Sequence, residues 1–171
     1  MFLVSKNFVN RFFNLIPLLI LLFLAFSDTD LNFEKLSFLS FNLMNILIFY
    51  WVLKNPDILG YGFIFLAGII NDVVIGSPIG ISSVTFLILA GFAAYVRNLT
   101  VRPSLIYDWV VFVPSLTVTN SIYFYILKIF FDIDVNYITL LLNTVTTILL
   151  YPIFGILFGF LANAIIKEKN V

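Results

Sequence analysis

The sequence contains no cysteine and no histidine, and only 11% of its residues are charged. The absence of cysteine excludes a disulfide framework and a thiol nucleophile, and the absence of histidine excludes an imidazole base. Together these absences remove the usual protein ligands of zinc. We therefore expect no metal and no cofactor, and any catalysis would have to rest on carboxylates.

Apolar residues dominate what is present. They make up 62% of the 171 residues, and the mean hydropathy is +1.12. Such values are far from those of a soluble globular domain. The composition predicts an integral membrane protein. The apolar runs along the chain predict that it is all-α, a six-transmembrane-helix bundle that forms a single membrane domain over residues 1–171.

Six apolar runs are separated by short polar loops, and about 20 residues of helix are needed to cross the hydrocarbon. A cleaved signal peptide is the alternative for the first run, because Ala25-Phe26-Ser27 has small residues at the spacing that a signal peptidase reads. Before the last run, residues 135–142 form either a short interfacial helix or the start of one long helix kinked at Pro152. The predicted spans are 8–26, 36–53, 58–75, 79–96, 105–127 and 143–166.

The basic residues indicate the orientation of this bundle. With six spans, seven of the nine lysines and arginines lie on one side of the membrane and two on the other. Because basic residues collect in cytoplasmic loops, both termini are predicted to be cytoplasmic.

Residues 68–80 are the most distinctive stretch, because a single acid interrupts a long apolar run among three glycines. On a helix, Gly60, Ile64, Gly68, Asp72 and Gly76 would form one stripe, since positions four apart share a face. Small residues let another helix approach closely, and an ionisable group at membrane depth must find a partner. We therefore expect Asp72 to face protein and not lipid.

Two roles are open for Asp72. The break at Gly76-Ser77-Pro78 predicts a hairpin of two helices, so the carboxylate can cap the exposed amides at the start of the following helix. Alternatively, its charge meets a cation on a partner protein, a role favoured by the glycine stripe. The candidate partner-binding or helix-packing residues are Gly68, Asp72, Gly76, Pro78 and Gly80.

A second glycine face occurs in the last apolar run. Gly155 and Gly159 form a G-x-x-x-G pattern, which is typical of close helix packing. We favour packing within the chain over dimerisation with a second copy. Pro152 and Asn143 are assigned to the same helix-packing set.

An enzymatic role finds little support. The sequence has neither H-E-x-x-H nor G-x-S-x-G. Asp72 and Asp108 superficially resemble the pair of an intramembrane aspartyl protease, but the predicted topology separates them by most of a hydrocarbon core about 30 Å thick. Asp108 is instead expected to be a cytoplasmic carboxylate near Arg102.

Several of these residues resemble a known family. The spacing G-x-x-x-D-x-x-x-G-x-x-x-G from Gly68 to Gly80 is similar to a signature of the rod shape-determining protein MreD family. The other residues that carry the resemblance are Tyr50-Trp51, Pro56, Gly62, Phe65, Ala94-Tyr95, Asn143 and Tyr151-Pro152. It implies a fold similar to that of the substrate-binding subunits of energy-coupling-factor transporters.

The resemblance also implies a function in the bacterial inner membrane. A member would be a non-enzymatic subunit of the cell-elongation complex that packs against the bitopic protein MreC, and through it links the MreB filament to the peptidoglycan synthases. The partners would be these proteins and the lipid bilayer, with no nucleic acid. The alternative is a vitamin-type transport subunit. Subunits of that kind resemble one another in an Ala-x-x-x-Ala docking face on the first helix. The first run has only Ala25 at that place.

Overall fold

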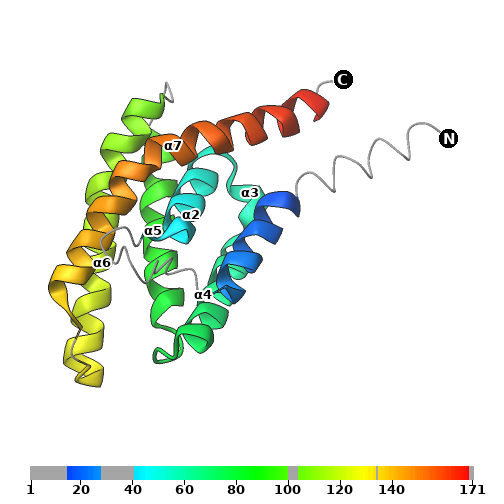
Figure 1. Cartoon of the computed structure of the whole chain (residues 1–171). Helices are drawn as coiled ribbons and strands as arrows, with labels where there is room; N and C mark the ends of the chain where they lie inside the picture. Colours follow the sequence, from blue (N-terminus) through cyan, green and yellow to red (C-terminus); the bar gives the residue numbers. More distant parts are fainter. Residues whose placement is uncertain (1–14, 28–40, 100–103, 134, 170–171) are drawn as a thin grey trace.

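The computed structural model describes residues 15–27, 41–99, 104–133 and 135–169, and every regular element within them is a helix (Figure 1). The all-α prediction is therefore confirmed for these residues. The beginnings of the first two predicted spans, 8–14 and 36–40, lie outside them. The helices are Leu15–Phe26, α2 Leu43–Lys54, α3 Pro56–Leu59, α4 Tyr61–Ile75, α5 Ile81–Leu99, α6 Leu105–Phe131 and α7 Tyr137–Lys169.

Three of these helices are long and apolar enough to cross a membrane, namely Ile81–Leu99, Leu105–Phe131 and Tyr137–Ala162. Three more apolar helices are shorter: Leu15–Phe26, Leu43–Lys54 and Tyr61–Ile75. Large apolar side chains are exposed on the outside of the bundle, where a soluble protein would carry charge. These features indicate a membrane protein, and the count of six spans stays a prediction.

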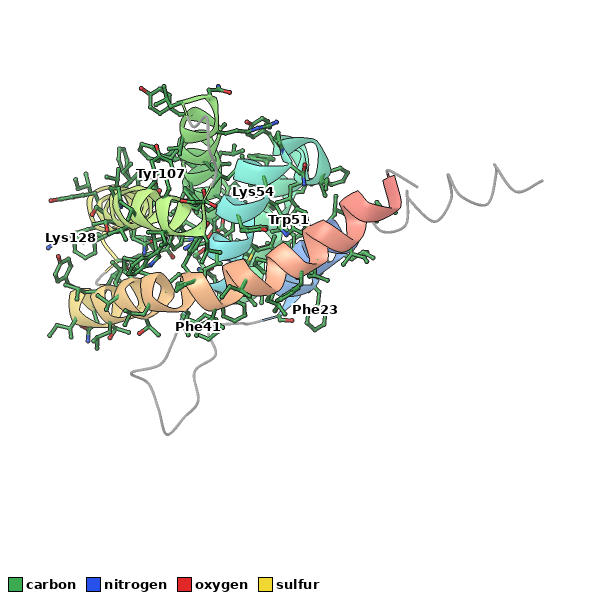
Figure 2. The ribbon with its side chains drawn as sticks, turned by 90° about the horizontal axis from the view of Figure 1, so that it is seen from above. Phe23, Phe41, Trp51, Lys54, Tyr107 and Lys128 are labelled. Atoms are coloured by element: carbon green, nitrogen blue, oxygen red, sulfur yellow. The ribbon has the colours of Figure 1, made fainter. Side chains whose placement is uncertain are left out.

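Helix α2 forms the centre of the bundle. All ten residues from Met44 to Leu53 are buried, so the helix has no outward face. It contacts α3, α5, α6 and α7, and Figure 2 shows Trp51 and Lys54 near the middle of the bundle with other helices around them. A helix that is apolar on all sides is stable when its whole circumference is enclosed.

Helix α7 is continuous from Tyr137 to Lys169, with Pro152 inside it. Of the two alternatives for residues 135–142, the structure therefore shows the single long helix, and this helix bends along its length (Figure 1). Proline has no N–H to donate to the carbonyl four residues earlier, which is that of Ile148. The indole Nε1 of Trp109 on α6 donates to that carbonyl oxygen at 2.8 Å, so a neighbouring helix replaces the missing bond.

The predicted third span, 58–75, is divided in the structure. The short α3 ends at Gly60, whose φ of +57° is a conformation that glycine adopts readily, and α4 begins at Tyr61. The predicted helical stripe is therefore shorter than expected. Gly60 and Gly76 flank α4, while Ile64, Gly68 and Asp72 lie within it and are buried.

Candidate functional site

The carboxylate of Asp72 joins the end of α4 to the start of α5. Ser77 Oγ donates to Oδ1 at 2.7 Å, and the Gly80 N–H donates to Oδ2 at 2.7 Å. The Ser82 N–H is shared between the two oxygens, at 3.1 and 3.2 Å. The side chain is completely buried. These bonds are those of a cap on the following helix, because they satisfy backbone amides that a helix start leaves unpaired.

Gly68 lies at a close approach of α4 and α5. A Cβ atom at this position would lie 2.6 Å from Ser83 Oγ and would also collide with the Ser83 backbone. Ser83 Oγ in turn donates to the Phe65 carbonyl oxygen at 2.8 Å. A side chain larger than that of glycine would therefore push the two helices apart.

Gly76 and Gly80 serve the turn in a different way. Both have positive φ, +71° and +102°, and a Cβ atom at either would meet nothing within 4 Å. Gly76 ends α4, and its N–H and that of Ser77 both donate to the Asp72 carbonyl oxygen. Pro78 sits between them, and its carbonyl accepts from the Ile81 N–H at 3.4 Å. These three residues set the path of the hairpin, and only Gly68 is placed by close packing.

The opposite end of the bundle holds a buried ion pair. Lys54 Nζ, at the end of α2, lies 2.6 Å from Asp108 Oδ2, in the first turn of α6. Asp108 is only 1% exposed. Asp108 lies in the first turn of α6, as expected, but it is buried and paired with Lys54. Arg102 lies outside the described residues, so its expected nearness to Asp108 stays a prediction. The signal available in the sequence was that both ionic residues lie at span ends on the same predicted side.

The two acids lie at opposite ends of the bundle. Asp72 lies in the last turn of α4, the helix that runs into the α4–α5 turn at the lower end in Figure 1, and Asp108 lies at the start of α6, at the upper end. Within the described residues, no group of three or more acidic side chains converges to hold a metal ion. The arrangement therefore offers no shared-proton carboxylate pair.

The second glycine face of α7 is turned toward the bundle. A Cβ atom on Gly155 would lie 3.1 Å from a δ-methyl of Leu105, and one on Gly159 would lie 3.6 Å from Tyr50 Oη. Next to them, Phe112 stacks on Tyr151 with ring centroids 4.4 Å apart. Sequence reasoning did not identify this aromatic contact, because aromatic residues are abundant throughout the chain.

A polar cavity of about 440 Å³ lies at the same end as the Asp72 hairpin. It is bounded by parts of α2, α4, α5, α6 and α7, including Asn143. Sequence reasoning placed Asn143 among the packing residues and did not predict this cavity. Its lining includes six asparagines: Asn42, Asn45, Asn71, Asn120, Asn136 and Asn143.

Comparison with known proteins gives one finding. A family model described as rod shape-determining protein MreD matches residues 6–161. No curated protein and no solved structure matches the chain.

Proposed function

The chain belongs to the rod shape-determining protein MreD family, and from this membership we propose that it is a non-enzymatic inner-membrane subunit of the cell-elongation complex. The family match carries this proposal, since it covers residues 6–161 and gives the chain a role in determining rod shape. The subunit packs with an MreC-type bitopic protein and links the MreB filament to peptidoglycan synthesis.

The chemistry of the described residues supports a role in assembly. Asp72 is satisfied by hydrogen bonds within its own hairpin, and Asp108 is paired with Lys54. Neither carboxylate is presented to a substrate as an acid, a base or a nucleophile. The bundle acts as a scaffold, because it offers a rigid surface in the membrane on which a partner's helix packs.

We place that surface on the outside of the α4–α5 hairpin. Leu66 and Val73 on α4 are 51% and 63% exposed. On α5, Gly91 is exposed and a Cβ atom there would meet nothing within 4 Å, so a second helix can come close. A single transmembrane helix of the MreC-type partner packs against these residues.

The five candidate residues of the hairpin act on this surface indirectly. Gly68 sets the distance between α4 and α5, Asp72 ties the hairpin together, and Gly76, Pro78 and Gly80 set its turn. These three contributions fix α4 and α5 relative to each other. The outer face of the hairpin is therefore ordered before a partner binds, which reduces the entropy lost on binding.

The residues of α7 have the matching internal role. Gly155 and Gly159 let α7 lie close to Leu105 and Tyr50. Pro152 lies at the bend of α7. Asn143, closer to the start of α7, lines the cavity. A six-span bundle of this kind would be similar in fold to the substrate-binding subunits of energy-coupling-factor transporters.

Cysteine crosslinking tests the partner surface, since the chain has no cysteine of its own. Cysteines at Leu66 and Val73 should form disulfides, after mild oxidation in membranes, with cysteines in the transmembrane helix of a co-expressed MreC-type protein. Ile156 on α7 is 52% exposed and serves as the matched control. Crosslinks at Ile156 in place of Leu66 and Val73 would move the partner to α7 and reject the assignment.

The proposed topology has six spans and cytoplasmic termini. Cysteines placed at Asp30 and Asp134 should react with a membrane-impermeant maleimide added from the periplasmic side, and cysteines at Asn98 and Lys169 should be protected until the membrane is opened. We expect this pattern because seven of the nine basic residues lie on one predicted side, and basic residues collect on the cytoplasmic side. Equal labelling of all four positions, or the reverse pattern, would contradict the topology.

A further inference from the structure

We propose that the polar cavity between α2, α4, α5, α6 and α7 binds an uncharged small molecule rich in hydroxyl and amide groups, of the size of a mono- or disaccharide. This inference rests on the cavity alone and holds whether or not the partner surface is correctly placed. It assigns the bundle a ligand in addition to its role in assembly.

The size and lining of the cavity fit such a ligand. Its volume is about 440 Å³, within the range of roughly 300–1,000 Å³ typical of small-molecule sites. Asparagine amides reach it from α2, α4, α6 and the start of α7, and α5 adds the hydroxyl groups of Ser82 and Thr85. In a chain that is 62% hydrophobic, this convergence of amides and hydroxyls is a local exception.

No charged side chain of the described residues lines the cavity. The nearby carboxylate of Asp72 is engaged by Ser77, Gly80 and Ser82, so it is not available as a counter-ion. A charged ligand would lose its hydration on entering the cavity and would find no opposite charge there, which carries a large free-energy penalty. The cavity therefore selects neutral molecules.

One buried group in the lining lacks a partner. Asn45, on the central helix α2, is only 5% exposed, and its Oδ1 atom accepts no hydrogen bond from any described residue. A buried acceptor without a donor is unfavourable, so Asn45 would be a poor choice for packing alone. Oδ1 itself is closed to the cavity, so a ligand hydroxyl or amide N–H would satisfy it once the Asn45 amide turns toward the space that this residue lines.

Neighbouring amides are only partly used. Asn71 Nδ2 donates to Ser82 Oγ at 3.2 Å, and Asn120 Nδ2 donates to Thr144 Oγ1 at 2.7 Å. Each bond uses one of two amide protons. Apolar surface is supplied by Met44 and Phe86, against which the carbon face of a sugar ring can lie.

Calorimetric titration of the full chain in lipid nanodiscs tests the proposal. N,N′-diacetylchitobiose and N-acetylglucosamine are the probes, because both are neutral and carry hydroxyl and acetamide groups. Glucosamine and glucuronic acid are the matched charged probes. We expect saturable binding of at least one neutral sugar and at least tenfold weaker binding of both charged ones. Absence of binding up to about 10 mM sugar, a Kd that corresponds to only about −3 kcal/mol, or equal binding of the charged sugars would overturn the proposal.

Variants locate the binding in this cavity. Asn45→Leu should weaken sugar binding at least tenfold while the melting temperature of the ligand-free protein stays equal or rises, because the unpaired acceptor is removed. Asn98→Leu, on the exposed end of α5, should change neither property. Should Asn45→Leu fail to fold, Thr139→Trp at the exposed rim provides the second test, since the added ring should block entry. Unchanged sugar binding in the folded variants would overturn the proposal.

A further arm distinguishes a soluble ligand from a lipid headgroup. Nanodiscs that contain a monoglucosyl diacylglycerol should raise the apparent Kd of the free sugar if a glycolipid headgroup occupies the cavity. An unchanged Kd would assign the site to a soluble sugar. Both results support binding of a neutral sugar, and they differ only in its source.

Discussion

Substitution of Asp72 tests the feature on which the α4–α5 hairpin depends. In an Asp72→Asn variant, the amide oxygen can take the place of Oδ2 and accept from the N–H groups of Gly80 and Ser82. The amide nitrogen then takes the place of Oδ1 and donates to Ser77 Oγ, which as a hydroxyl can also accept. The contacts are kept, and only the strengthening by charge is lost.

An Asp72→Ala variant removes every acceptor at once. The N–H of Ser82 is buried and that of Gly80 is partly buried. A buried donor left without a partner costs about 1–3 kcal/mol, so two such donors would cost about 2–6 kcal/mol. Because the Gly80 N–H is only partly buried, we expect the lower part of this range, about 2–4 kcal/mol, as the loss in the free energy of unfolding. This exceeds the loss of about 0.5–2 kcal/mol for an ordinary exposed helix cap. For Asp72→Asn we expect about 1 kcal/mol.

The assay is reversible denaturation of the purified protein in detergent, together with recovery of the MreC-type partner from membranes. Asp132→Asn is the matched control, since Asp132 is exposed at the end of α6 in a left-handed conformation that asparagine also adopts. If both Asp72 variants lose the partner while the free energy of unfolding is unchanged, the charge of Asp72 acts on a partner cation and the capping argument is refuted.

Three further predictions concern the other contacts of the bundle. Gly155→Leu and Gly159→Leu should each lower the free energy of unfolding in detergent by about 1–3 kcal/mol, because the added side chain holds α7 away from its neighbours. Unchanged stability of both variants would mean that this face of α7 is exposed to lipid. Lys54→Met should cost about 3–5 kcal/mol by leaving a buried charge unpaired, and adding Asp108→Leu should recover most of the loss; a double variant less stable than Lys54→Met would contradict this. Trp109→Phe should cost about 1 kcal/mol by removing the hydrogen bond to the partly buried Ile148 carbonyl, and a melting curve equal to that of the unmodified protein would show that the carbonyl finds another donor.

The hairpin at residues 76–80 could be predicted because its causes are local. Gly76-Ser77-Pro78 ends one helix, and an acid four residues before Gly76 is within reach of the next helix start. The sequence did not decide between a cap and a partner for Asp72. That choice depends on the positions of the Gly80 and Ser82 amides, which only the folded turn defines.

Contacts between distant helices could not be predicted in the same way. In a chain with so much apolar sequence, a helix that faces lipid and one that is enclosed have similar hydrophobicity, so α2 gave no sign of its central place. Asp108 was assigned to the nearest arginine in sequence, whereas its partner, Lys54, comes from another helix. The cavity was missed because its asparagines occur singly along the chain and meet only when the helices pack.

The enclosure of α2 has a consequence for biosynthesis. The ribosome completes α2 before α5, α6 and α7, the helices that later surround it. Until they emerge, Asn45 lacks its final neighbours and the bilayer is a poor solvent for its amide, while Lys54, at the end of α2, lacks its counter-ion. A nascent chain that stops before α6 would therefore carry Lys54 without Asp108.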